Sequence, residues 1–132
     1  MSAAKKILVI DDEVDTVTYL TTLLEDNGYE TVSANDGQEG LEKVRSENPD
    51  LVLLDVTMPQ KSGMGFYKEI KSDPKFASTP VIFVTGVTGF DGDKEAIKKF
   101  IEGRPSLPSP EGFFPKPIDQ EVFLKKIGEI LA

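Results

Sequence analysis

The stretch KILVIDDEVD, residues 6–15, runs from a nearly pure hydrocarbon segment straight into three consecutive acids. The apolar run at 7–10 is continuous rather than alternating, which is typical of a strand buried on both faces of a parallel sheet. Beyond the acids, apolar residues recur at steps of three and four over 14–24, which predicts an amphipathic helix. The acids therefore lie at a strand-to-helix junction, where they fit either the polar first turn of a helix or a binding site.

The same unit of strand and helix recurs along the whole chain. Four further apolar runs have the length of strands, at 31–34, 51–55, 81–84 and 112–115. Helical spacing lies between or after them, at 37–47, 64–72, 91–102 and in the segment that follows Asp119. Strict alternation with right-handed crossovers predicts an α/β fold, a (βα)5 flavodoxin-like doubly wound parallel sheet in the strand order 2-1-3-4-5.

Composition narrows the functions that this fold can carry. The chain has 132 residues, 39% hydrophobic and 29% charged, as expected of one domain spanning 1–132 with a core at about 5–131. It has neither cysteine nor histidine, which excludes disulfides, thiolate or imidazole zinc sites and Ser-His-Asp triads. A net charge of −8 disfavours direct binding of nucleic acid and favours a cation or a basic partner. We expect a cytoplasmic protein without a membrane segment, because no apolar run is long enough to span a bilayer.

Carboxylates converge at the point where the predicted strand order reverses. Asp11 and Asp12 end the first strand, and Asp55 ends the third, which is its neighbour in the sheet. Like charges gathered at one sheet edge are unfavourable unless a cation compensates them. Carboxylates and waters, with no histidine or cysteine available, are the ligands that a hard ion such as Mg²⁺ prefers. The pattern therefore predicts a magnesium site formed by these three acids.

Two more polar residues end strands at the same edge. Thr85 ends the fourth predicted strand and Lys116 the fifth. A carboxylate such as Asp55 can attack phosphorus and form an acyl phosphate. A lysine ammonium and a threonine hydroxyl can contact the remaining phosphoryl oxygens. Gly86, directly after Thr85, leaves room for a phosphoryl group against the backbone.

The motifs VIDDE, LVLLDVTMPQKSG, VIFVTG and PKP follow one another in the order found in response-regulator receiver domains. The chain resembles this family over about residues 5–131. The resemblance implies that Asp55 accepts a phosphoryl group from a histidine kinase or a histidine phosphotransferase. It also implies that Asp12, Asp55 and the main-chain carbonyl of Thr57 ligate Mg²⁺ directly, and that Asp11 acts through water.

The resemblance further implies a conformational switch. Thr85 would be drawn toward the acyl phosphate, Lys116 would pair with it, and Phe113 would follow Thr85 into the vacated space. The output face would then be formed by the predicted helix at 91–102, the strand at 112–115 and the helix that follows Asp119. Three departures from the family bear on this face, and one of them is Pro115, which places a proline on both sides of Lys116. Phe113 lacks the hydroxyl of the usual tyrosine, and the Pro-, Ser- and Gly-rich loop at 103–112 is longer than usual.

We interpret the chain as a stand-alone receiver, a signalling module with intrinsic phosphotransfer and slow autodephosphorylation rather than an enzyme. Its downstream partner would be a protein, and we expect a monomer or a weak dimer. An Asp-nucleophile phosphatase is one alternative, but the stretch from Asp55 to Thr57 lacks the second Asp of the D-x-D-x-T motif. A receiver-like docking module that is never phosphorylated is another, which the complete set of acids, threonine and lysine disfavours.

Overall fold

The fold is built on one parallel sheet of five strands. The structure is a computed structural model, which describes residues 5–55, 62–85, 111–115 and 118–131. The strands are β1 (Lys6–Ile10), β2 (Glu30–Ala34), β3 (Leu51–Asp55), β4 (Val81–Thr85) and β5 (Gly112–Pro115). Their order is β2-β1-β3-β4-β5, and every pairing is parallel. The predicted strand order is therefore confirmed, and each predicted strand agrees with the observed one to within one residue at either end.

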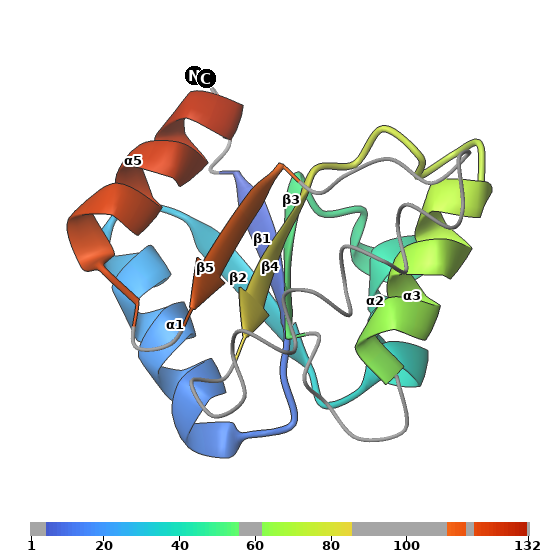
Figure 1. The fold of residues 1–132 in the computed structure, drawn as a ribbon, viewed down its shortest axis with the longest axis horizontal. Coiled ribbons are helices and arrows are strands. Elements are labelled where there is room, and N and C mark those ends of the chain that lie inside the picture. Colours follow the sequence, from blue (N-terminus) through green and yellow to red (C-terminus); the bar gives the residue numbers. More distant parts are fainter. Residues whose placement is uncertain (1–4, 56–61, 86–110, 116–117, 132) are drawn as a thin grey trace.

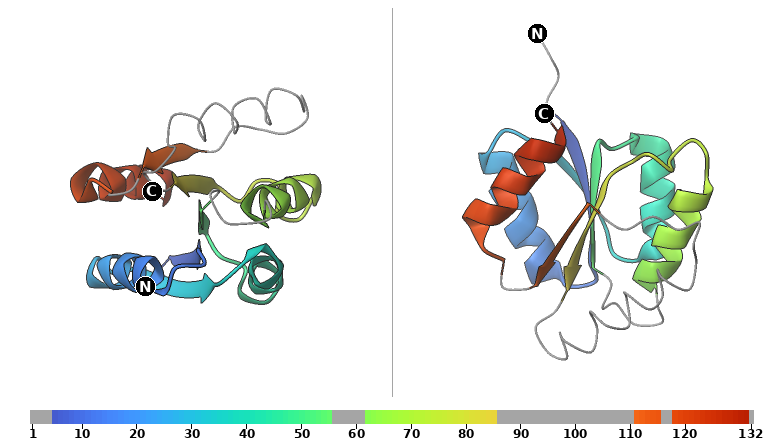
Figure 2. Two further views of the ribbon diagram at one scale, coloured as in Figure 1. Left: turned by 60° about the horizontal axis from the view of Figure 1, so that its bottom comes forward. Right: turned by 45° about the horizontal axis from the view of Figure 1, so that its top comes forward.

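Helices cover both faces of the sheet, as a doubly wound fold requires (Figure 1, Figure 2). The helices α1 (Val14–Asp26) and α5 (Gln120–Leu131) lie on one face, and α2 (Gly37–Glu47) and α3 (Ser62–Ser72) lie on the other. The predicted helix at 91–102 lies outside the described residues, as does most of the predicted loop at 103–112. Within the described part of the chain, no helix combines the length and apolar character needed to cross a bilayer.

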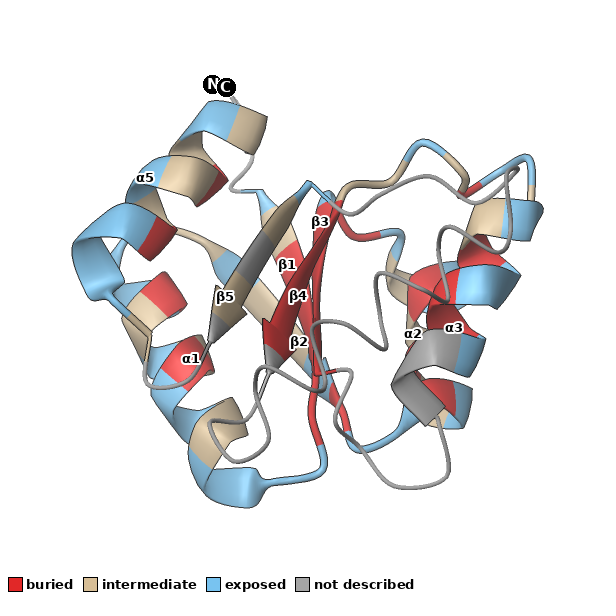
Figure 3. Cartoon of the chain, in the orientation of Figure 1, coloured by how far each residue is buried: buried red, intermediate tan, exposed pale blue. Residues whose placement is uncertain are grey.

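Alternation along the strands divides the core into two layers. In β1, Leu8 and Ile10 belong to the cluster that contains residues of α2 and α3. Ile7 and Val9 belong to the cluster that contains residues of α1 and α5. Figure 3 shows the result: the central strands are buried along their length, while each helix exposes its outer surface. Burial on both faces explains why these strands appear in the sequence as continuous apolar runs.

Local signals set the ends of the helices. Asp36 caps α2, because its Oδ1 accepts a hydrogen bond from the backbone N–H of Glu39 at 2.8 Å. The same helix ends at Asn48, which adopts the left-handed conformation with φ 49°. Helix α1 ends just before Gly28, whose φ of 91° is accessible mainly to glycine. These ends return the chain to the amino edge of the sheet, where the next strand begins.

Candidate functional site

Three carboxylates meet at the carboxyl edge of β1 and β3. Asp11 directly follows β1, Asp12 comes next, and Asp55 is the last residue of β3. The two strands are neighbours, with Ile10 opposite Leu54, so they end at the same level. One carboxylate oxygen from each acid lies within 4.8 Å of the other two. The structure thus brings together the three acids that the sequence pattern assigns to one edge.

The three acids differ in exposure and in how the main chain holds them. Asp11 and Asp55 are only 1% and 2% exposed, whereas Asp12 is exposed. The Oδ1 atom of Asp11 accepts a hydrogen bond from the backbone N–H of Glu13 at 2.9 Å. The backbone N–H of Asp11 donates to the carbonyl oxygen of Ala34 in β2 at 3.1 Å. Contacts with β2 and with the residue before α1 therefore fix the orientation of Asp11.

The electrostatics of this edge favour a bound cation. Removing a carboxylate from water costs roughly several kcal/mol per ion when nothing compensates its charge. Here two buried carboxylates lie beside a third, so desolvation and mutual repulsion act together. The donor set is made of oxygen atoms alone, because the chain contains no histidine or cysteine. Such a set fits Mg²⁺ or a similarly hard cation.

The structure places one further predicted site residue at this edge and leaves others undescribed. Thr85 is the last residue of β4 and lies opposite Pro115 of β5. Asp55 lies opposite Val84, so the backbone of Thr85 extends one residue beyond Asp55 on the neighbouring strand. The side chain of Thr85 is not among the described atoms. Three other predicted site residues lie outside the described residues: Thr57, Gly86 and Lys116.

The predicted switch residue Phe113 is placed through its backbone only. It lies in β5, opposite Phe83 of β4, and its side chain is not described. Its neighbour Phe114 packs with Phe123 of α5 in an edge-to-face contact, with ring centroids 5.3 Å apart. Strand β5 is therefore attached to the sheet on one side and to α5 on one face.

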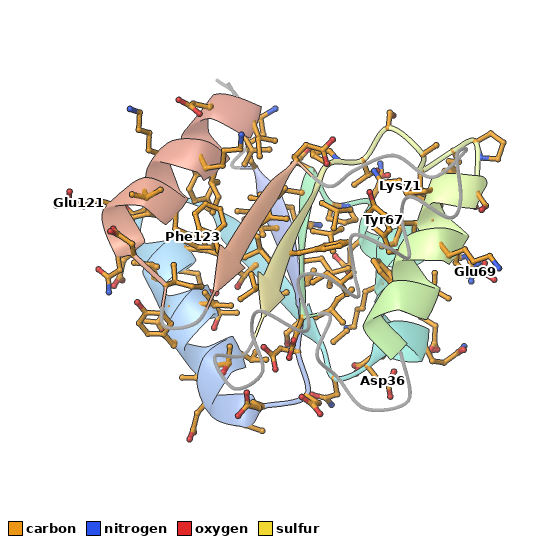
Figure 4. The ribbon with its side chains drawn as sticks, in the orientation of Figure 1. Asp36, Tyr67, Glu69, Lys71, Glu121 and Phe123 are labelled. Carbon is orange, nitrogen blue, oxygen red and sulfur yellow. The ribbon has the colours of Figure 1, made fainter. Side chains whose placement is uncertain are left out.

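Sequence reasoning missed a second group of polar residues at the amino edge of the sheet. This amino-edge cluster comprises Tyr67, Lys71 and Glu111. The Nζ atom of Lys71 donates to the carbonyl oxygens of Ala77, at 3.2 Å, and of Thr79, and lies 5.8 Å from the centre of the Tyr67 ring. Figure 4 shows both side chains between α3 and the sheet. In sequence they look like ordinary positions of an amphipathic helix, so no pattern indicates the cluster.

Burial is the main cause of the pKa shifts of Tyr67 and Lys71. It raises the pKa of Tyr67 well above its ordinary value, and the negative charge of Glu111 adds to that effect. Burial lowers the pKa of Lys71, and Glu111 opposes this by favouring the charged ammonium. The carboxylate of Glu111 therefore acts on both residues of α3, although it lies directly before β5 in the chain.

Comparison with known proteins gives matches over nearly the whole chain. The family model of the response regulator receiver domain matches residues 7–128. Protein PilH of Pseudomonas aeruginosa is 32% identical over 96% of this chain and 98% of PilH. The polar-differentiation response regulator DivK of Brucella ovis is 31% identical over 97% of each protein. The solved structure of the chemotaxis protein CheY4 of Vibrio cholerae has a TM-score of 0.78 at 29% identity, covering 98% of this chain and 100% of that one. This chain therefore belongs to the response regulator receiver domain family.

Proposed function

We propose that this receiver of two-component signalling is phosphorylated on Asp55 in a Mg²⁺-dependent reaction. The observation that carries the proposal is the position of Asp55. It ends the central strand β3, is 2% exposed and lies within 4.8 Å of two other acids, measured between carboxylate oxygens. A carboxylate held in this way is a suitable nucleophile for phosphorus, because covalent attack splits one difficult transfer into two easier steps.

The residues at this edge fit a magnesium ion. Asp12 and Asp55 would hold it directly, together with the main-chain carbonyl of Thr57, and Asp11 would act through water. The support is the close approach of the three carboxylates and the absence of histidine and cysteine from the sequence. When bound, the ion neutralises charge on the phosphoryl oxygens and on the acids themselves.

The chain's own groups perform the transfer. An oxygen of Asp55 attacks the phosphorus of a phosphohistidine, so a P–O bond forms as the P–N bond breaks. The imidazole leaves with the electron pair and takes up a proton. The ammonium of Lys116 and the hydroxyl of Thr85 contact the phosphoryl oxygens, and Gly86 leaves space for them. The expected activity is one transfer followed by slow hydrolysis, not sustained turnover of phosphoesters.

The proposed partners follow from this chemistry. A histidine kinase or a histidine phosphotransferase supplies the phosphoryl group, and a protein that remains to be identified receives the signal. In the proposed switch, Thr85 moves toward the acyl phosphate and Phe113 follows it. This reshapes the face made by β5, α5 and the predicted helix at 91–102. Such a switch is a local charge event that biases a two-state element.

Beryllofluoride, a mimic of the phosphoryl group, tests the proposal in solution. The wild-type protein is titrated with beryllofluoride in the presence and absence of Mg²⁺ and followed by NMR. We expect Mg²⁺-dependent binding with resonance shifts around Asp55 and Phe113, and no binding to the Asp55→Asn variant. In Thr85→Ala, binding remains but the shifts around Phe113 shrink. A wild-type protein that binds no beryllofluoride would contradict the proposal, and equal shifts in Thr85→Ala would contradict the switch.

A further inference from the structure

The strand β5 is the least firmly specified strand of the sheet. It lies at the sheet edge, so it has a strand partner, β4, on one side only. Its pairing with β4 comprises four residues, the sequence GFFP. The last of these, Pro115, has no backbone N–H to donate. Few hydrogen bonds therefore hold this strand in place.

The side chains of β5 also specify its register poorly. Register in a sheet is normally fixed because a slip by one residue turns the apolar side chains to the wrong face. Here Phe114 packs against Phe123 of α5, and the residue before it is also a phenylalanine. A one-residue slip would bring Phe113 to the place of Phe114 and keep an aromatic ring against α5.

Glu111 makes two hydrogen bonds to β4 that depend on the register of β5. Its backbone N–H donates to the carbonyl oxygen of Val81 at 2.8 Å, and its Oε1 atom accepts from the backbone N–H of the same residue at 2.8 Å. Main chain and side chain together thus bind both polar groups of one residue, the first of β4. A shift of β5 in either direction would break both bonds. A hydrogen bond to a carboxylate is also stronger than one between neutral groups.

Lys71 reinforces this contact from α3. Its ammonium is oriented by the carbonyl oxygens of Ala77 and Thr79 in the turn that leads to β4. The charge of Glu111 raises the pKa of Lys71 against the effect of burial, so the two opposite charges attract each other. The carboxylate of Glu111 is therefore hydrogen-bonded to β4 and also attracted by the charge of Lys71 in α3.

We propose that Glu111 sets the register of β5 against β4, and thereby positions the carboxyl end of β5 at the phosphoacceptor site. The positioning part rests on the proposed function, because Lys116 directly follows Pro115 in the chain. The register of β5 against β4 therefore determines where Lys116 begins relative to the ends of the other strands. Glu111 is thus a positioning residue at the opposite end of the sheet from the acids, with no contact with the phosphoryl group.

The register is tested by NMR on the full chain. In Glu111→Ala, the cross-strand contacts between Val81 and residue 111 disappear, and the amides of residues 112–114 exchange about tenfold faster, as expected when a hydrogen bond to a charged group is lost. The amides of β1 and β3 keep their exchange rates. Glu111→Gln retains an acceptor oxygen and preserves most of the protection. Glu129→Ala, at an exposed position of α5, is the control and changes neither quantity. Unchanged contacts and exchange rates in Glu111→Ala would overturn the proposal.

The positioning role is tested by comparing two affinities in the same variants. Glu111→Ala should bind Mg²⁺ as the wild type does, because the three acids do not depend on β5. Its Mg²⁺-dependent affinity for beryllofluoride should fall about tenfold, and Glu111→Gln should restore it. Equal beryllofluoride affinity in Glu111→Ala and wild type would refute the positioning role. If the wild type binds no beryllofluoride, the proposed function and the positioning role both fail, while the exchange measurement still decides the register.

Discussion

Asp11 and Asp55 lie on neighbouring strands, both almost fully buried, and carboxylate oxygens of the two lie within 4.8 Å of each other. Such a pair of like charges is costly inside a protein unless a cation is bound. The stability of the fold and the proposed chemistry of the site should therefore both depend on the same bound cation.

The first prediction concerns this link between metal and stability. Mg²⁺ at ten times its Kd should raise the free energy of unfolding by about 1.4 kcal/mol. Asp12→Asn should abolish most of that increase. Without metal, the same variant should be about 0.5 kcal/mol more stable than wild type, because it removes one of three like charges at an exposed position. Urea unfolding with and without Mg²⁺ measures both effects.

Glu13→Gln is the matched control for this prediction. Its backbone N–H bonds to Asp11, but its side chain has no part in the proposed metal site. It should keep the full stabilisation by Mg²⁺. Equal stabilisation of wild type and Asp12→Asn would show that the acids do not hold the ion.

The second prediction concerns the close packing of α2 on the sheet. A Cβ at Gly40 would lie 2.6 Å from Ile10 Cδ1 and 3.2 Å from the ring of Phe66. Gly40→Ala should therefore lower the free energy of unfolding by about 2 kcal/mol through overpacking. Ile10→Val removes the atom in closest contact and should recover part of the loss when the two changes are combined. Urea unfolding of the single and double variants measures this coupling.

Gly65, in the neighbouring helix α3, is a glycine at which an added side chain would cause no overpacking. A Cβ there would meet nothing within 4 Å, and the position is exposed. Gly65→Ala should raise the stability by about 0.5–1 kcal/mol, because alanine loses less backbone entropy in a helix. A similar loss of stability in Gly40→Ala and Gly65→Ala would refute the packing argument.

The third prediction concerns alkaline pH. Tyr67 has a pKa raised by burial above the ordinary value of 10.0. The folded state therefore keeps the phenolic proton at a pH where the unfolded state loses it. The stabilising contribution is complete below pH 10 and is lost as the pH rises further. Tyr67→Phe removes this dependence, so its stability should fall less steeply than that of the wild type between pH 9 and about 11.

Lys71 contributes to the pH dependence of stability with the opposite sign to Tyr67. Its pKa is lowered by burial, so the unfolded state binds its proton more tightly and stability rises with pH in its titration range. The residue is present in both proteins, and the comparison of wild type with Tyr67→Phe therefore isolates the tyrosine. Parallel curves for the two proteins would contradict the assignment.

The fourth prediction concerns the cap of α2. Asp36→Ala should lower the free energy of unfolding by about 1 kcal/mol, because the N–H of Glu39 loses its acceptor at 2.8 Å. Asp36→Asn keeps an acceptor oxygen and should stay close to wild type. Thermal unfolding of the two variants measures the difference, and an equal loss in both would point to the charge rather than to the hydrogen bond.

The sequence predicts most of this fold because its strongest signals are local. Continuous apolar runs identify β1, β3 and β4 as strands buried on both faces, and strict alternation with helices leaves few topologies. Helix α3 begins two residues earlier than its apolar spacing indicates, at Ser62. The first turn of a helix need not contain a buried residue, so its start is weakly encoded by periodicity.

The sequence predicts those parts of the candidate site that lie at the ends of predicted strands. The meeting of Asp11 with Asp55 follows from sheet topology, since parallel neighbours end at the same edge. The amino-edge cluster is not predictable in this way. Glu111 acts through a side chain that binds the backbone of Val81, thirty residues earlier, and no periodic pattern encodes such a contact.

The most direct test of the central claim is covalent. The protein is incubated with acetyl phosphate and Mg²⁺, and its intact mass is measured. We predict one added phosphoryl group on the wild type, none on Asp55→Asn, and none on the wild type when a chelator removes the metal. No adduct on the wild type, or an undiminished adduct on Asp55→Asn, would contradict the account.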